Sequence, residues 1–90
     1  MVQYEIKVTG RVQGVGFRHY TRLKANEFDI KGWVRNTVDG GVKIVAKGEE
    51  TDMETFIDFL RIGPVLSRVD KITKVKIEYP GEFDNFSVKF

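Results

Sequence analysis

Hydrophobic and polar residues alternate near the start of the chain. Tyr4, Ile6 and Val8 are separated by Glu5 and Lys7, and this period of two predicts a half-buried strand. From residue 17 the period becomes helical. One face of this helix carries its apolar and small side chains: Phe17, Tyr20, Thr21, Ala25 and Phe28. The opposite face carries polar ones: His19, Arg22 and Asn26.

The middle of the chain predicts two strands joined by a tight turn. Segment 30–38 reads as a strand, and segment 42–48 reads as its returning partner. Asp39-Gly40-Gly41 lies between them. Glycine accepts the positive φ that hairpin turns require. We therefore expect a hairpin at this point.

The second half predicts a clear helix and two more strands. Thr51 and Glu54 have the spacing of a capping box, and Gly63-Pro64 has the pattern of a helix end. Between them, apolar residues recur at helical spacing: Met53, Phe56, Ile57 and Leu60. Segment 69–79 then predicts a strand. The alternation of Phe86, Val88 and Phe90 predicts a short last one.

The order of these elements is β-α-β-β-α-β with one strand appended. It predicts an α+β fold, the ferredoxin-like sandwich, in which a mostly antiparallel sheet carries two helices on one face and a short extra C-terminal strand. The chain has 90 residues, so we expect a single free-standing domain, 1–90. Many unrelated activities use this fold, and function has to be argued from the site.

Composition narrows the classes of function. The chain is 41% hydrophobic and 31% charged, as globular proteins are. It has no cysteine, which excludes disulfides and thiol nucleophiles; we expect a cytoplasmic protein. The sequence shows neither a signal peptide nor the ~20 apolar residues that cross a bilayer, so no membrane contact is expected. A net charge of +2 and a pI near 9.0 favour small anionic ligands and permit nucleic acid only weakly.

The glycine-rich segment GRVQGVGFR, residues 10–18, predicts an anion site. Its glycines, Gly10, Gly14 and Gly16, let the backbone approach a ligand closely, and the segment leads into a helix N-terminus, which favours negative charge. Arg18 at the junction can donate two parallel hydrogen bonds to a phosphate. From glycine spacing alone, an ordinary turn remains the alternative. The spacing matches neither dinucleotide-binding nor Walker loops, and no carboxylate in the loop offers a magnesium ligand.

Asn36 and Thr37 form a second polar cluster at the end of a predicted strand. Asn36 could simply start the turn, or its amide could orient a water molecule toward a bound phosphorus. An amide cannot act as the base, and neither cluster holds a general acid or base. The leaving group must therefore depart unaided. A carboxylate does so readily because its conjugate acid has a pKa of about 4, so the residues suit hydrolysis of a carboxyl–phosphate anhydride.

Together, GRVQGVGFR at 10–18 and GWVRN at 32–36 resemble the two signatures of the acylphosphatases. The resemblance continues through the hairpin, the second helix, GPVLSRV at 63–69 and the Phe-x-Val ending. It implies a hydrolase of small acyl phosphates, such as acetyl phosphate, carbamoyl phosphate and 1,3-bisphosphoglycerate. It also implies that the enzyme uses no metal or other cofactor and forms no phosphoenzyme. We expect inorganic phosphate or sulfate as a bound anion, no nucleic-acid partner, and a monomer.

The same resemblance implies roles for individual residues. Arg18 binds the phosphoryl group, and Asn36 positions the attacking water. Thr37 is a weaker candidate for orienting Asn36. The backbone N–H groups that hold the phosphoryl group belong to one loop: Gln13, Gly14, Val15, Gly16, Phe17 and Arg18. His19 receives no role.

Two other classes of function stay open. An RNA-binding module shares the element order, but KGWVRNTV does not match its aromatic motif, since Arg35 stands at the second aromatic position. A phosphate-binding regulatory domain without turnover would keep the loop and Arg18 but would have no need of Asn36.

Overall fold

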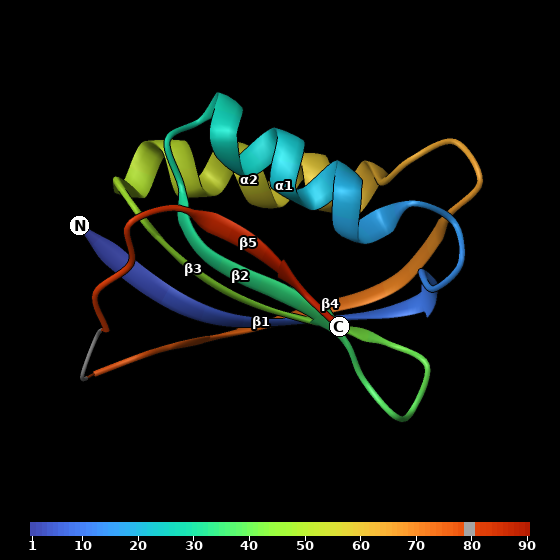
Figure 1. Ribbon diagram of the computed structural model, residues 1–90. Helices are drawn as coiled ribbons and strands as arrows, with labels where there is room; N and C mark the ends of the chain where they lie inside the picture. Colours follow the sequence, from blue (N-terminus) through green and yellow to red (C-terminus); the bar gives the residue numbers. More distant parts are fainter. Residues whose placement is uncertain (79–80) are drawn as a thin grey trace.

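The computed structural model describes residues 1–78 and 81–90. These residues form two helices and five strands (Figure 1). The elements are β1 (Val2–Arg11), α1 (Phe17–Glu27), β2 (Lys31–Asn36), β3 (Val42–Gly48), α2 (Glu50–Ile62), β4 (Arg68–Lys76) and β5 (Phe86–Lys89). The strands make one sheet in the order β4-β1-β3-β2-β5, and both helices cover the same face of it. The predicted α+β, ferredoxin-like fold is confirmed.

The direction of the strands decides which residues meet at each edge of the sheet. Strand β1 pairs antiparallel with β3 and β4, and β2 pairs antiparallel with β3. Strand β5 instead runs parallel to β2, with Arg35 opposite Lys89. Because parallel strands end at the same edge, Asn36 and the end of β5 come to lie together.

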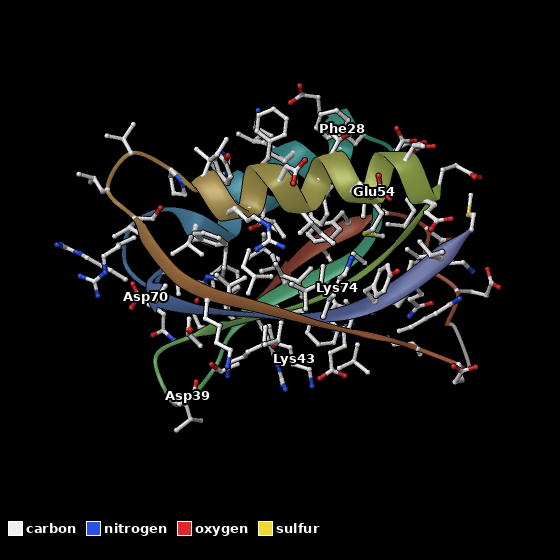
Figure 2. The ribbon with its side chains drawn as sticks, turned by 180° about the vertical axis from the view of Figure 1, so that it is seen from behind. Phe28, Asp39, Lys43, Glu54, Asp70 and Lys74 are labelled. Atoms are coloured by element: carbon white, nitrogen blue, oxygen red, sulfur yellow. The ribbon has the colours of Figure 1, made fainter. Side chains whose placement is uncertain are left out.

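The two faces of the sheet have opposite character. The face under the helices buries apolar side chains that share one parity along their strands: Ile6, Val8, Val34, Ile44 and Ala46. Helix α2 adds the residues predicted from its spacing: Met53, Phe56, Ile57 and Leu60. The other face carries mostly polar side chains, with Trp33 and the buried Val45 among them, and Figure 2 shows Lys43 on the side away from the helices.

Helix α1 buries Phe17, Thr21 and Ala25, three members of its predicted apolar face. The other two, Tyr20 and Phe28, are only half-buried because they lie toward α2. There the Tyr20 hydroxyl donates to the carbonyl of Phe59 at 2.8 Å, and the Phe28 ring stacks on the Phe59 ring at 5.6 Å between centroids.

The prediction that Gly10 belongs to the loop is wrong. Strand β1 continues through Arg11, where it pairs with Arg68 of β4. Gly10 lies in the strand at a shift of register, with φ 127°, and a Cβ there would come 2.1 Å from the carbonyl oxygen of Arg68. This glycine is required by the close approach of β4, a tertiary contact that glycine spacing does not reveal.

The predicted capping box is also wrong. The N-cap of α2 is Glu49, two residues before Thr51, and it makes no side-chain capping bond. Glu50 and Asp52 place negative charge in the first turn instead, where it interacts favourably with the positive end of the helix dipole. The predicted end is correct in position, and Gly63 takes a positive φ of 68°, although its ψ of 174° is extended rather than left-handed helical.

The predicted strands differ from the observed ones mainly at their ends. Strand β2 begins at Lys31 and stops at Asn36, two residues before the predicted end, because Thr37 already closes the hairpin by donating to the carbonyl of Gly41 at 2.9 Å. Strand β4 begins at Arg68 and ends at Lys76. Position 79 of the predicted strand lies outside the described residues.

Candidate active site

A pocket of about 640 Å³ opens between the start of α1, the end of β2 and strand β5. Its lining includes Gly14, Gly16, Phe17, Arg18 and Asn36. The two clusters singled out from the sequence therefore meet in one cavity. Gln13, Val15 and Thr37, which were also expected to contribute, are not among the residues that line it.

The loop that precedes α1 is anchored by its apolar residues. Val12 and Phe17 are buried and Val15 packs against the core. Gly14 and Gly16 lie between these anchors with φ of 73° and 81°, and a Cβ at either would meet no atom of the described residues within 4 Å. Unlike Gly10, these glycines have open space beside them. Because the glycines alternate with the anchoring apolar residues, the loop lines the pocket with backbone that carries no side chain.

No side chain among the described residues caps the N–H groups at the N-terminus of α1. Gly16 is the N-cap and offers no capping group, and the first turn contains no acidic residue. The N–H groups of Phe17, Arg18 and His19 precede the first helical donor, since the N–H of Tyr20 is the one that donates to the carbonyl of Gly16. Free donors and the positive end of the helix dipole make this end of the pocket suited to an anion.

Arg18 is held in place by the end of β5. Its Nη1 donates to the carbonyl of Lys89 at 3.1 Å, and its guanidinium carbon lies 4.6 Å from the centroid of the Phe90 ring. Two contacts thus fix the side chain at the rim of the pocket. The remaining N–H groups of the guanidinium stay available for an oxyanion.

Asn36 is the last residue of β2 and pairs with Val42 of β3. Its side-chain oxygen, Oδ1, is buried and has no hydrogen-bond partner among the described residues. Buried polar atoms nearly always find a partner, and leaving one without costs about 1–3 kcal/mol. This oxygen is closed off from solvent, so a water molecule or a ligand hydrogen can reach it only when the amide rotates toward the pocket that Asn36 lines.

Thr37 points into a different cluster. Its hydroxyl donates to the Asp39 carboxylate and lies 3.1 Å from Nζ of Lys7, which also forms an ion pair with Asp39 at 2.9 Å. Hydrogen bonds from Thr37, from Lys7 and from the backbone N–H of Gly41 lower the pKa of Asp39 to about 2. The hydroxyl of Thr37 thus contacts the hairpin and β1 rather than the amide of Asn36.

Strand β5 supplies a pocket wall that the sequence did not reveal. Phe86, Val88 and Phe90 line the cavity, whereas their alternation predicted only a strand. The parallel pairing with β2 brings this strand beside Asn36. His19 and Arg22 of α1 also line the pocket, and their side chains lie 3.4 Å apart.

The described residues contain neither a membrane-spanning helix nor a cluster of metal ligands. No helix among residues 1–78 and 81–90 is long and apolar enough to cross a membrane. Within these residues, no three His, Cys, Asp or Glu side chains gather where they could hold a metal ion.

Comparison with known proteins agrees with the resemblance seen in the sequence motifs. The family model for acylphosphatase matches residues 4–88. An acylphosphatase from Archaeoglobus fulgidus is 42% identical over 90 residues and the alignment covers all of both chains. One from Syntrophotalea carbinolica is 42% identical over 89 residues, covering 99% of this chain and 97% of the relative.

Solved structures give the same result. The crystal structure of acylphosphatase from Bacillus subtilis matches with a TM-score of 0.96 and 37% identity over the full length of both chains. A HypF protein from T. kodakarensis matches with a TM-score of 0.87 and 41% identity, but the match covers only 12% of that longer protein. From the family model, the full-length relatives and the structural match, we conclude that this chain belongs to the acylphosphatase family, whose members hydrolyse acyl phosphates.

Proposed function

We propose that hydrolysis takes place in the pocket at the start of α1, by in-line attack of water on phosphorus. In this proposal the backbone N–H groups of residues 13–18 and the guanidinium of Arg18 bind the phosphoryl group. Asn36 orients the water. The reaction uses no metal ion and forms no phosphoenzyme.

The observation that supports this assignment is that Asn36 lines the same pocket as the glycine loop and Arg18, while its Oδ1 has no partner among the described residues. An amide oxygen accepts hydrogen bonds and cannot remove a proton at neutral pH. Once the side-chain amide turns toward the pocket, this oxygen can hold one hydrogen of a water molecule and leave the water's lone pair directed at a phosphorus atom bound by the loop. A purely structural asparagine in a turn would be expected to use this acceptor locally.

The proposed reaction needs no side chain that donates or accepts a proton. The water oxygen bonds to phosphorus while the bond between phosphorus and the acyl oxygen breaks, and the electron pair leaves with the carboxylate. The water's proton passes to a phosphoryl oxygen. Negative charge on the three equatorial oxygens is then stabilised by the loop N–H groups and Arg18.

The first experiment measures loss of benzoyl phosphate absorbance in the presence of EDTA for the wild type and for Asn36→Ala. We expect Asn36→Ala to lose on the order of 10²-fold in kcat while binding inorganic phosphate normally. Asn26→Ala is the matched control, because Asn26 is exposed on α1 and lies outside the pocket lining.

The possible results separate the competing functions. Substantial turnover by Asn36→Ala would exclude the water-orienting role. Phosphate binding without turnover by the wild type would favour a regulatory phosphate-binding domain. Activity abolished by EDTA would exclude the metal-independent reaction.

Arg18→Ala tests the binding half of the proposal. We expect it to lose most phosphate affinity and activity, because the Arg18 guanidinium lies at the rim of the pocket, where its N–H groups can bind phosphate. Competitive inhibition by phosphate or sulfate is the corresponding prediction for the wild type. That the protein is monomeric and cytoplasmic also stays a prediction, and sedimentation and fractionation of cells would check it.

A further inference from the structure

The side chain of Gln13 joins the phosphate loop to the β2–β3 hairpin. Its Nε2 donates to the carbonyl oxygen of Thr37 at 2.7 Å and to that of Gly41 at 2.9 Å. The side chain is half-buried and does not line the pocket. Gln13 therefore turns away from the ligand space, although its backbone belongs to the predicted phosphate loop.

The two carbonyls that Gln13 contacts are the ones that close the hairpin. Thr37 N–H donates to the carbonyl of Gly41 at 2.9 Å, and Gly40 N–H donates to that of Thr37 at 3.2 Å. Thr37 directly follows Asn36, and Gln13 directly precedes Gly14. One amide group thus connects two segments that each lie one residue from a part of the proposed active site.

A glutamine amide suits this position. Its –NH₂ has two donors, one for each carbonyl. Glutamate would present acceptors to acceptors, methionine would donate nothing, and asparagine would be one methylene too short to keep both contacts. Along the chain, by contrast, the loop and Asn36 are connected only through the whole of α1 and the whole of β2.

We propose that Gln13 is a positioning residue that sets the separation between the phosphate loop and the water-orienting amide of Asn36. The inference rests on the function proposed above. A displacement of about 1 Å between reacting groups can lower a rate by ~10²-fold. Losing the Gln13 amide relaxes this separation, while Arg18 and the loop N–H groups still bind phosphate.

The test is a double-mutant cycle between Gln13→Met and Asn36→Ala, with kcat and KM for benzoyl phosphate and the inhibition constant for inorganic phosphate. In the wild-type background, we expect Gln13→Met to lower kcat roughly tenfold with little change in phosphate affinity. In the Asn36→Ala background it should have almost no further effect on kcat, because the group that it positions is absent.

Gln3→Met is the matched control. Gln3 lies in β1, the strand that precedes the loop with Gln13, and it is not part of the pocket lining. Its activity should stay at the wild-type level. Thermal unfolding of each variant shows whether it is folded at the assay temperature. If Gln13→Met is unfolded at that temperature, Gln13→Asn takes its place in the test. The asparagine keeps the amide group, but its shorter side chain cannot reach both carbonyls.

Two results overturn the inference. One is an equal loss of kcat from Gln13→Met in both backgrounds, which would mean that Gln13 supports the loop without acting through Asn36. The other is an unchanged kcat in the wild-type background. Full activity of Asn36→Ala alone would instead refute the proposed function, and the role of Gln13 with it.

Discussion

Helices α1 and α2 resemble one another in length and position but begin in opposite ways. They contain 11 and 13 residues and cover the same face of the sheet (Figure 1). Helix α2 begins with Glu49, Glu50 and Asp52, so its own carboxylates complement the positive end of the dipole. Helix α1 begins with a glycine, no acid, and Arg18.

The difference is between a helix start whose positive end is complemented by its own carboxylates and one whose positive end is not. At α2 the sequence supplies the negative charge permanently. At α1 it supplies donors and a further positive charge, which is unfavourable for the empty helix and favourable when an anion is bound. We infer that changes at the α1 start alter activity first, and changes at the α2 start alter stability first.

Giving α1 a carboxylate of its own should have the largest effect. Gly16→Asp places a negative charge where the phosphoryl group is proposed to bind, so we expect kcat/KM to fall by roughly 10²-fold or more. Gly40→Asp is the control, because Gly40 also has a positive φ and no neighbour within 4 Å among the described residues. An equal loss of kcat/KM in both variants would contradict the inference that the start of α1 controls activity.

Removing the carboxylates of α2 should produce the converse result. The double variant Glu50→Gln, Asp52→Asn should lose about 1 kcal/mol of unfolding free energy in urea at low salt, and less at high salt, because each charge near a helix end contributes ~0.3–1 kcal/mol. Its kcat for benzoyl phosphate should equal that of the wild type. A clear loss of activity would show that the two helix starts are not independent.

A smaller effect is expected where Arg18 meets β5. Phe90→Ala removes the ring beneath the guanidinium, and an exposed cation–π contact contributes about 0.5–1 kcal/mol, equivalent to roughly a two- to fivefold change in affinity. We expect KM to rise by this factor with little change in kcat. Phe83→Ala serves as the control, since Phe83 lies near the second, smaller pocket.

The smallest predicted effect concerns the carboxylate nearest to Asn36 along the hairpin. The pKa of Asp39 lies at about 2, below its ordinary value of 3.8, because Thr37 and Lys7 donate to the charged form. The stability from these bonds is present above pH 3.8 and is lost as the pH falls through about 2. The urea midpoint should therefore fall less on acidification in Asp39→Asn than in the wild type.

Local patterns predicted the fold well because each element matches its own period. The alternation of β1 and the spacing of α2 gave both elements and their buried faces. Ends were less predictable. The capping box at Thr51 and the loop assignment of Gly10 failed because Glu49 begins the helix and because β4 pairs with β1 beyond the apolar alternation. Neither contact leaves a local signal.

The candidate site also has a part that local sequence predicted and a part that it did not. Gly14, Gly16, Arg18 and Asn36 were identified by residue type and motif, and they line one pocket. The wall from β5 and the contacts of Gln13 and Thr37 were not foreseen, because they depend on parallel pairing with β2 and on side-chain directions across the hairpin. Residue chemistry predicted four of the residues that line the candidate site, and only the tertiary structure shows how they are supported.

The bond from Arg18 to the carbonyl of Lys89 joins residues 71 positions apart. During synthesis the loop, α1 and Asn36 leave the ribosome well before residues 86–90, so the arginine has no support and the pocket has no β5 wall until that strand is added. A nascent chain stalled after β4 would hold the phosphate loop and Asn36 yet bind phosphate poorly. Activity in this enzyme should appear late, when the last edge of the sheet is added.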